Sequence, residues 1–412
     1  MTARATLARL GVLMAAVFVD MLGYLMVLPL LPYYAERMGA SPFEIGLLVA
    51  AFAFAQLATA PVWGKVSDRY GRRPVILSGL ALSSAAYLLF GLADTLWVLT
   101  LSRLVQGAGG GINGVIQAYV ADAVPSEDRA KALGWVTAAT SAGVMVGPLV
   151  GSLGTTISAA APGFIASGLC LLNVLFVFFL LPESVSREQP VDGQRQSVRT
   201  AMWRIFRHPG APAHVWIWVY TAGMMAFMAM NGVLALYLER VFGVTEATIG
   251  YLYSYVGAIS LLMRGVLLGP LINRFGEMNV LRMGAVAIGL GQLLIPIPGN
   301  LWLVAAVLAL VPIGTAMLFP ATTSQVSRHA RSGHVGQTLG LQQSLGGVAR
   351  MVGPIWAGAA FQHLGWSSPF WMAAALMGLA SLLALFGARG AATVRSAEQA
   401  VPPVEEPRPV DG

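Results

Sequence analysis

Apolar runs of about 20 residues, separated by short polar segments, recur along the whole chain. A run of this length is what an α-helix needs to cross roughly 30 Å of hydrocarbon. The pattern predicts twelve membrane-spanning helices, and we expect the first to be retained rather than cleaved as a leader. The predicted spans are residues 8–31, 44–63, 74–93, 95–120, 130–154, 163–181, 212–236, 246–268, 279–297, 301–323, 334–359 and 366–387.

The two halves of the chain repeat one another, with short motifs returning at offsets between 203 and 206 residues. Such a repeat indicates duplication of a structural unit. The matching pairs are Glu36-Arg37 with Glu239-Arg240, Ile45-Gly46 with Ile249-Gly250, Leu96-Trp97 with Leu301-Trp302, Gly147-Pro148 with Gly353-Pro354, and 64–74 with 269–276.

We therefore predict an all-α membrane protein of two pseudo-symmetric six-helix bundles, residues 1–182 and 212–388. Because each half has six spans, the halves have the same orientation, and a substrate site is expected between them near the midplane. Residues 183–211 form a polar cytoplasmic linker. Residues 389–412 contain Pro and Glu without apolar periodicity, so we expect a disordered cytoplasmic tail.

Composition and charge support a membrane protein and fix its orientation. The residues AVILMFWYC make up 57% of the chain and charged residues 10%, too little charge to cover a soluble domain. Most of the 25 Lys and Arg lie in alternate loops on the side of both termini, whereas Arg37 and Arg240 lie on the other. The positive-inside rule then predicts a multi-pass protein of the plasma (inner) membrane with cytoplasmic termini. The net charge of +7 is a topology signal, and we expect no nucleic-acid partner.

Cysteine and histidine usage predicts no metal site. Cys170 is the single cysteine and lies in an apolar run, and the five His show no ligand spacing. The sequence contains no Walker A, HExxH or GxSxG motif. We therefore expect no cofactor and no enzymatic activity. Transport would have to be driven by an ion gradient or by the substrate itself.

Asp20 is the one acid placed deep within a predicted span. A carboxylate in hydrocarbon is costly unless it is paired, protonated or facing water. One interpretation is a structural partner for a nearby Arg. The other is a titrating group that exchanges a proton for substrate, because burial favours the neutral form.

Polar residues follow the fourth span at helical spacing. On one continuous helix they fall within an arc of about 80°. Lipid cannot satisfy such a stripe, so it faces either another helix or a water-filled cavity, and its Arg favours the cavity. The stripe consists of Arg103, Gln106, Gly110, Asn113 and Gln117.

The substrate cavity is expected to draw on both halves. Arg350 could bind an anionic substrate or cap backbone carbonyls, whereas Arg264, near a span end, could extend its head to the interface. The predicted cavity residues are Asp20, Gln106, Asn113, Gln117, Asn231, Gln343 and Arg350.

The basic loop between the second and third spans places Asp68 four residues before Arg72, and Asp122 ends the fourth span on the same side. A carboxylate–guanidinium–carboxylate bridge would join the second and fourth spans. The alternative is an exposed pair worth at most about 1 kcal/mol. The predicted cytoplasmic gate consists of Gly64, Asp68, Arg69, Gly71, Arg72, Arg73 and Asp122.

The fifth span carries Gly143, Gly147 and Gly151 at intervals of four, with Pro148 beside them. Glycines on one helical face allow a second helix to approach closely, and the proline can bend the helix. From the residues alone this is mainly a packing signal.

Together these motifs resemble the major facilitator superfamily, specifically its twelve-helix drug:proton antiporters, and are similar to tetracycline-type efflux pumps. The loop Gly64–Pro74 matches the family pattern GxxxDRxGRRP, and Leu101–Gly107 resembles the motif of the fourth span. Gly143–Gly151 resembles the antiporter motif GxxxGPxxG. Asp20, Gly23, Pro29 and Pro32 match the first span of tetracycline-type pumps.

The resemblance implies rocker-switch exchange of a cytoplasmic substrate for external protons. Asp20 would carry the proton or a cationic substrate group, and Arg103 would assist the transfer. Tetracycline pumps carry further acids in spans three and nine, where this chain has Ala86 and Ile288, which argues against metal-tetracycline as substrate. The expected partners are a small-molecule substrate, protons and the lipid bilayer, and we expect a monomer.

Two alternatives remain open at this stage. Three Arg within spans against one Asp suggest a proton-coupled transporter of an anionic metabolite. A membrane-embedded sensor or enzyme would need a signalling domain or a catalytic cluster, which the sequence does not contain.

Overall fold

The computed structural model of the chain describes residues 3–125, 127–184, 209–330 and 334–399, together with residues 203, 205 and 207. For residues 3–8, 113, 130 and 386–399 it describes the backbone alone. Most of the predicted linker 183–211 lies outside the described residues. The regular structure of the described part is helical throughout, which confirms the predicted fold class.

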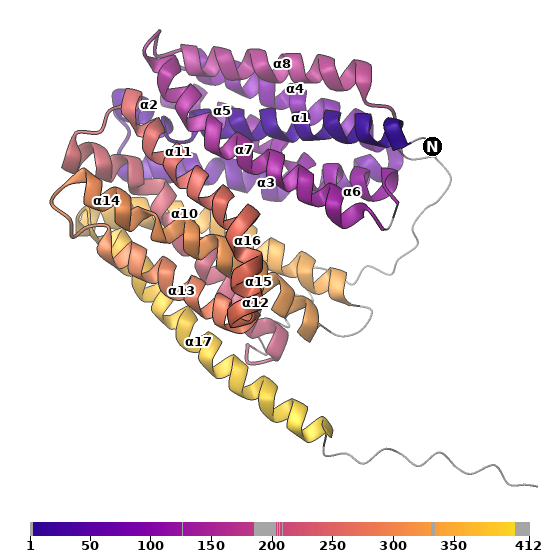
Figure 1. The fold of residues 1–412 in the computed structure, drawn as a ribbon. Coiled ribbons are helices and arrows are strands. Elements are labelled where there is room, and N and C mark those ends of the chain that lie inside the picture. The colour runs from indigo at the N-terminus through magenta and orange to yellow at the C-terminus, as the bar shows by residue number, and fades with distance from the viewer. Residues whose placement is uncertain are drawn as a thin grey trace, which may run out of the picture.

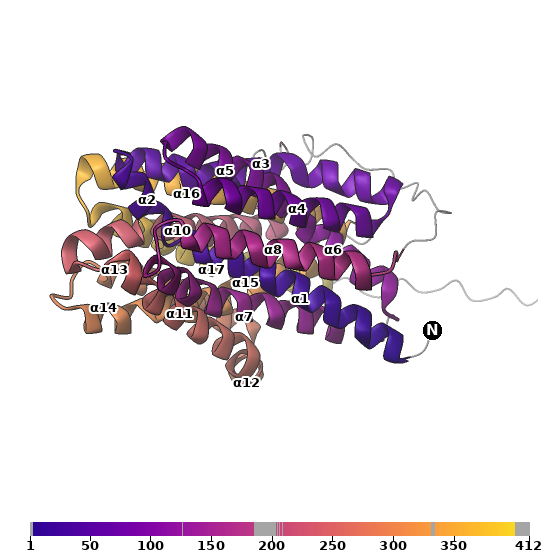
Figure 2. The ribbon, with the colours of Figure 1, turned by 90° about the horizontal axis from the view of Figure 1, so that it is seen from above.

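The helices form two groups (Figures 1 and 2). The N-terminal half contains α1 (Ala3–Val27), α2 (Leu31–Arg37), α3 (Pro42–Tyr70), α4 (Arg72–Gly91), α5 (Leu96–Gly109), η1 (Gly110–Ile112), α6 (Asn113–Ala123), α7 (Arg129–Thr155) and α8 (Ala161–Leu180). The C-terminal half contains α10 (Pro212–Phe242), α11 (Glu246–Leu262), η2 (Met263–Leu267), α12 (Leu268–Phe275), α13 (Glu277–Leu294), α14 (Leu301–Leu308), α15 (Leu310–His329), α16 (Val335–Leu364) and α17 (Ser368–Gln399). In Figure 1, α1, α4 and α8 of the first group run nearly horizontally, whereas α13 and α17 of the second run obliquely to them.

Nine helical segments of the described chain are long and apolar enough to cross a membrane. The other three predicted spans fall on α5–η1–α6, α13 and α16. The first of these is divided by η1 at Gly110–Ile112 into two short helices. α16 carries the polar residues Gln342, Gln343 and Arg350. The chain is therefore a multi-pass membrane protein, and the count of twelve spans stays a prediction.

Several predicted spans are interrupted rather than continuous. α1 ends at Val27 and α14 ends at Leu308. Pro29, Pro32 and Pro312 follow these ends, and each lacks the N–H that would continue the ladder. The fourth span changes to a tight turn where Gly109, Gly110 and Gly111 occur in sequence, since consecutive glycines weaken a helix.

The last helix runs further than the sequence suggested. α17 continues to Gln399, past the boundary predicted at residue 388, and projects beyond the bundle in Figure 1. The segment 388–399 contains several alanines and no proline before Pro402, so its local preference favours helix. Residues 400–412 lie outside the described part.

The duplicated motifs meet each other at the interface between the halves. A methyl group built on Gly46 of α3 would overlap the carbonyl of Pro354 on α16. Likewise, one built on Gly250 of α11 would overlap the carbonyl of Pro148 on α7. The Ile-Gly motif of each half therefore packs on the Gly-Pro motif of the other, and glycine is required because backbone meets backbone.

The two halves touch at one end and stand apart at the other. We call the end with the turns at 38–41 and 243–245 the closed end, and the end with loop 64–74 the basic end. The largest apolar core contains buried residues of both halves, including Leu31 and Leu236 near the closed end. The other clusters of the described residues draw on one half each.

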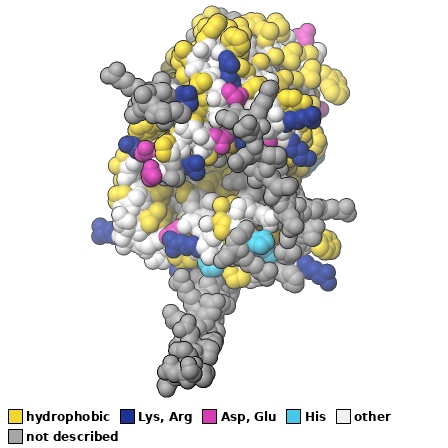
Figure 3. All heavy atoms as spheres, turned by 90° about the vertical axis from the view of Figure 1, so that its right-hand side faces the viewer, with side chains coloured by type: hydrophobic (Ala, Val, Ile, Leu, Met, Phe, Trp, Pro, Cys, Tyr) yellow, Lys and Arg dark blue, Asp and Glu magenta, His cyan; other side chains and the backbone are white. Residues whose placement is uncertain are grey.

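Glycines along the contacting helices show the same difference. Gly46 and Gly358 meet backbone of the opposite half near the closed end. Gly340 of α16, nearer the basic end, would have no heavy atom within 4 Å of an added methyl group. Figure 3 looks onto the basic end, where Lys and Arg side chains lie among Asp and Glu. The structure thus represents a conformation that is closed at one end.

Candidate functional site

A cavity of about 260 Å³ lies between the two halves. Its wall is mostly apolar and aromatic, with hydroxyl and amide groups and, among the described lining residues, one charged side chain, Arg264. This composition is typical of a small-molecule site. The lining residues are Met21, Tyr24, Leu25, Leu28, Thr140, Ser141, Val144, Phe227, Met228, Met230, Asn231, Leu234, Tyr253, Val256, Gly257, Ser260, Arg264, Pro312, Thr315 and Phe319.

Of the predicted cavity residues, Asn231 lines this space. Its amide Nδ2 donates to the Phe227 carbonyl at 2.8 Å. Gln343 and Arg350 lie on α16 outside the lining set, where the Tyr220 hydroxyl donates to Gln343 Oε1 at 3.5 Å. Arg350 also interacts with Tyr220. The structure therefore groups these two predicted residues with Tyr220, beside the cavity.

Sequence reasoning missed Arg264, Tyr24 and Tyr253 as cavity residues. Arg264 was interpreted as a side chain that reaches the membrane interface, yet it lies on the cavity wall. The signal was present, because an Arg inside an apolar run is itself a marker of a polar cavity. Tyr24 is one helical turn from Asp20, but an aromatic residue in an apolar run carries no comparable signal.

Asp20 faces the interior of the N-terminal bundle. Its side chain is 5% exposed, and the Ser83 hydroxyl of α4 donates to its Oδ1 at 3.4 Å. The adjacent Met21 lines the cavity, so Asp20 lies beside the cavity wall. None of the ion pairs of the described residues joins Asp20 to an Arg. The interpretation as a structural ion-pair partner therefore lacks support in this conformation.

Arg103 is buried in the same bundle, with 1% exposure. Its guanidinium lies over the Phe90 ring, 5.5 Å from the centroid. Its Nε, Nη1 and Nη2 have no hydrogen-bond partner among the described residues. A cation–π contact offsets only part of the cost of burying a cation. The side chain would gain stability wherever another conformation brings it an anion or water.

The predicted stripe on the fourth span is divided by the turn η1, so the assumption of one continuous helix was wrong. Arg103 and Gln106 are buried, and the Gln106 amide donates to the Tyr87 hydroxyl at 2.6 Å. Gln117, on α6 beyond the turn, is exposed. The side chain of Asn113 is outside the described part. The polar residues therefore do not form one surface.

The basic loop forms a compact ionic cluster. Arg72 Nη1 lies 2.5 Å from Asp68 Oδ1, and its Nε lies 3.1 Å from Asp122 Oδ2. Nη1 also donates to the Ser67 hydroxyl at 2.6 Å. The three predicted gate residues Asp68, Arg72 and Asp122 thus come together and connect α3, α4 and α6 within the N-terminal half.

Glu183 belongs to this cluster, and the sequence did not suggest it. Its carboxylate accepts from the backbone N–H of Arg72 at 2.9 Å and of Arg73 at 3.2 Å. Gly71, at the start of α4, has no side chain that could cap the helix and adopts φ +102°. Glu183 therefore supplies the missing cap from the end of α8, where a carboxylate is favoured by the helix dipole.

The remaining gate residues lie around this cluster. Arg73 donates to the Phe178 carbonyl and lies 5.4 Å from the centroid of that ring. Arg69 lies 5.4 Å from the centroid of Tyr70. Gly64 would have no heavy atom within 4 Å of an added methyl group. Unlike Gly71, it therefore has no close contact that requires glycine.

The glycine face of α7 packs against α1 inside the N-terminal bundle. A methyl group on Gly143 would lie 2.5 Å from the Phe18 carbonyl oxygen, and one on Gly147 would lie 2.5 Å from that of Leu22. One on Gly151 would lie closer still to the Met26 carbonyl oxygen. Pro148, by contrast, contacts α11 in the other half. The antiporter-like motif therefore holds two neighbours, α1 and α11, on different faces.

Ion pairs cross between the halves at the closed end. Arg240 Nη2 lies 3.0 Å from Glu36 Oε1, and Arg37 Nη2 lies 2.5 Å from Glu246 Oε2. We call these two the cross-half pairs. The duplicated Glu-Arg motifs supply three of the four residues. A nearby hydrogen bond from the Ser152 hydroxyl to the Glu246 carbonyl, at 2.6 Å, also joins the halves.

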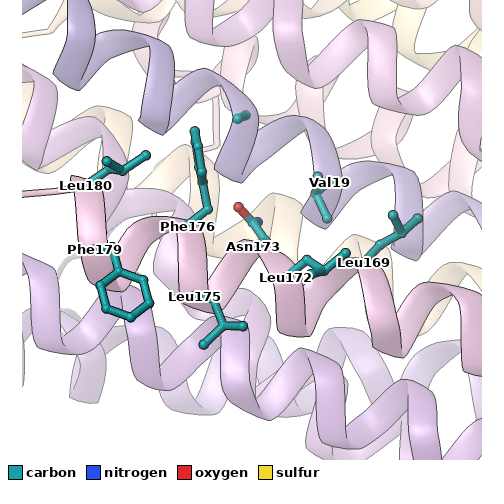
Figure 4. Close-up of a pocket in the computed structure, with 9 residues that line it drawn as sticks. Val19, Leu169, Leu172, Asn173, Leu175, Phe176, Phe179 and Leu180 are labelled. Atoms are coloured by element: carbon teal, nitrogen blue, oxygen red, sulfur yellow. The ribbon is translucent and has the colours of Figure 1, made fainter.

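A second, larger crevice of about 590 Å³ lies on one face of the N-terminal bundle, between α1 and α8. Figure 4 shows its Leu and Phe side chains along α8, with Asn173 directed toward α1. Asn173 Nδ2 donates to the Ala16 carbonyl at 3.1 Å, and Phe179 is 75% exposed. An exposed, almost wholly apolar surface suits contact with lipid chains rather than selective binding of a solute.

Comparisons with known proteins agree with this architecture. The profile of the Major Facilitator Superfamily matches residues 13–354 and again 265–408. The chain is 30% identical over 379 residues to the tetracycline resistance protein, class C, of Escherichia coli, covering 91% of this chain and 95% of that protein. It is 27% identical to multidrug resistance protein 2 of Bacillus subtilis (strain 168), covering 85% and 88%.

Solved structures show the same fold. The nucleoside transporter NupG superposes with a TM-score of 0.78 at 16% identity, covering 93% of this chain and 99% of that chain. The sequence profile, the curated relatives and the fold therefore lead to one assignment. The chain belongs to the Major Facilitator Superfamily.

Proposed function

We propose that this protein exports drugs or other small amphiphilic molecules in exchange for protons, by alternating access of one cavity to the two sides of the membrane. The observation that carries the proposal is a cavity walled by both halves, which touch at one end only. Rocking of two such halves about a central site is how this architecture can move a solute. The similarity to tetracycline and multidrug resistance proteins supports drugs as substrates.

We place the protein in the plasma (inner) membrane with both termini and the basic end in the cytoplasm, following the distribution of Lys and Arg. The conformation described is then inward-facing. We propose a monomer, in which the two halves of the chain supply the two walls of the cavity.

Asp20 and Arg103 form the proposed proton-coupling pair. Asp20 is a buried acid with one long hydrogen bond, and Arg103 is a buried cation without a hydrogen-bonded partner among the described residues. Movement of α1 or α5 that brought them together would favour release of the proton from Asp20, since a nearby cation stabilises the carboxylate. Conversely, separation favours proton uptake.

The substrate is proposed to be something other than metal-tetracycline. Ala86 and Ile288, at the positions where tetracycline-type pumps carry acids, are both fully buried. These positions therefore offer no carboxylate to a metal chelate, which is otherwise bound through oxygen ligands. The cytoplasmic gate is proposed to be the cluster of Asp68, Arg72 and Asp122.

The proposal is tested with purified protein in vesicles carrying an imposed pH gradient. Wild-type protein should accumulate a transported drug from a panel, and Asp20→Asn should abolish gradient-driven accumulation while retaining counterflow. Asp94→Asn, in an exposed loop, is the matched control and should behave as wild type. Gradient-driven accumulation by Asp20→Asn at the wild-type rate would remove Asp20 from the mechanism.

A second candidate is proton-coupled transport of an anionic metabolite. It is favoured by the excess of Arg103, Arg264 and Arg350 over Asp20 among the ionisable residues within the spans. The same vesicle panel distinguishes the two, because it includes both drugs and metabolites.

A further inference from the structure

Arg264 places one positive charge on the wall of the central cavity. The other described lining residues carry neutral hydroxyl, amide, thioether, aromatic or aliphatic side chains. Asp20, the buried acid of the adjacent helix, faces Ser83 inside the N-terminal bundle. A substrate in the cavity therefore meets a cation and no carboxylate of the described lining.

The position of Arg264 depends on a local irregularity of the backbone. It lies in the π-helical turn η2 between α11 and α12. Such turns shift the direction of side chains relative to a regular helix and occur frequently at functional sites. At the offsets of the internal repeat, the N-terminal half has residues 58–61, Ala-Thr-Ala-Pro. The charge of Arg264 therefore has no counterpart in the N-terminal half, and it cannot be explained as a structural element that both halves share.

Arg264 lines the cavity and is an exposed residue. Among the ion pairs of the described residues, none includes it. A guanidinium without a carboxylate partner presents a planar fork of donors suited to a carboxylate or sulfonate. In a cavity with low-dielectric walls this charge attracts anions and repels cations.

The rest of the wall suits a flat apolar body. Phe227 and Phe319 meet edge to face, with centroids 6.4 Å apart, and Met21 and Met228 lie among the lining residues. Aromatic edges and faces orient ring systems, and thioethers adapt to irregular shapes. A volume of about 260 Å³ lies just below the usual range for ligand cavities.

We propose that the substrates of this cavity are aromatic amphiphiles with a single anionic group, which is bound by Arg264 while the ring system lies among Phe227, Phe319 and the methionines. This inference rests on the proposed function, since it names the substrate class of the same site. Cations of equal shape are rejected, because they would be placed beside an uncompensated guanidinium.

Binding of three probes of matched shape tests the charge preference. The probes are 1-naphthaleneacetate, its neutral amide, and 1-naphthylethylammonium, measured by equilibrium dialysis with the full-length protein in detergent. Wild type should bind the anion about tenfold more tightly than the ammonium, as expected for one charge-assisted contact. Arg264→Gln should remove this preference and leave affinity for the amide unchanged. Arg274→Gln, an exposed Arg on α12, is the control and should retain it.

Ser260→Glu provides an independent variant, one helical turn from Arg264 on the same wall. It neutralises the site without removing the Arg and should also abolish the preference for the anion. Equal or tighter binding of the ammonium by wild type, failure to bind any probe, or an unchanged preference in the folded variants would overturn the proposed class.

Transport of the same probes separates this inference from the proposed function. If the ammonium binds preferentially and a pH gradient drives its export, the substrate class is wrong and the function stands. If the anion binds through Arg264 but no gradient moves it, the class stands and proton-coupled export is wrong.

Discussion

The closed end and the basic end both contain Arg–carboxylate pairs, but the pairs connect different parts of the molecule. At the closed end, Arg240 meets Glu36 and Arg37 meets Glu246, so each pair joins the two halves. At the basic end, Arg72 is held by Asp68 and Asp122, all within the N-terminal half. Ion pairs of similar geometry therefore have different consequences for motion.

A contact between the halves exists only while that end is closed, so it contributes directly to the balance between conformations. A conformational equilibrium responds only to interactions that differ between its states. A contact within one bundle can persist in every conformation and keeps the bundle rigid as it rocks. Changes at the closed end should therefore alter populations, whereas changes at the basic end should alter the stiffness of one half.

The largest effect is expected from Gly250→Leu. Its side chain would overlap the backbone carbonyl of Pro148 and the side chain of Ser152 on α7, and overpacking of this kind typically costs about 1–3 kcal/mol. We expect the closed end to be held apart and counterflow in vesicles to fall by at least about tenfold. Gly46→Leu, at the equivalent contact with Pro354, should have the same effect.

Gly168→Leu is the matched control for these variants. Gly168 is a helical glycine of α8 with no heavy atom within 4 Å of an added methyl group. It should support normal counterflow. If Gly250→Leu also exchanges substrate normally, the closed end does not require close contact of α7 and α11.

Breaking a cross-half pair should have a smaller effect. Glu36→Gln removes one partner of Arg240, and a partly exposed pair contributes about 1 kcal/mol or less. The population of molecules in which the halves have separated at the closed end should rise by up to about fivefold. Distance labels on α2 and α11 measure this population. The exchanged variant Glu36→Arg with Arg240→Glu should restore the wild-type distribution. Unchanged distances in Glu36→Gln would show that packing alone holds this end closed.

Asp68→Asn should slow the transport cycle. It should change the distribution between conformations less than Glu36→Gln does. It weakens the cluster that holds α3, α4 and α6 together, so less of the rocking motion is transmitted through the bundle. We expect exchange to slow by about threefold with substrate affinity unchanged, consistent with loss of one partly exposed ion pair. Lys65→Gln, at an exposed position of the same segment outside the predicted gate, is the control. Weaker substrate binding by Asp68→Asn would contradict a purely mechanical role.

The fold could be predicted from the sequence because hydrophobic length and duplication are both encoded locally. Each span is visible as an apolar run, and the repeated Gly-Pro and Ile-Gly motifs identified the duplication. What the motifs did not reveal was the pairing: Gly250 packs on Pro148 and Gly46 on Pro354, contacts between residues about 100 and 300 positions apart.

The candidate site was harder to predict because helix phase is lost at irregularities. The stripe from Arg103 to Gln117 assumed a continuous helix, and the turn η1 separates its members. Arg264 was not predicted as a cavity residue, because the π-helical turn that sets its direction has no sequence signature. Asp20 was identified as a deep acid, but composition could not show that it faces α4 rather than the cavity.

The smallest effect is expected from Glu183→Gln. Glu183 caps α4 through the N–H groups of Arg72 and Arg73, and it is exposed, so solvent screens its charge. Gln retains an oxygen acceptor and loses the favourable interaction of a carboxylate with the helix N-terminus, for an expected cost of about 0.5 kcal/mol. Thermal unfolding in detergent should shift slightly downward, while counterflow and the distances across the closed end stay at wild-type values. Glu183→Ala removes the acceptor as well and should cost about 1 kcal/mol.

These variants test the distinction between the two ends, because Glu183 touches only its own half among the contacts of the described residues. If Glu183→Ala instead changed the distances across the closed end, the basic-end cluster would be coupled to the contacts between the halves, and the distinction between the two ends would be wrong.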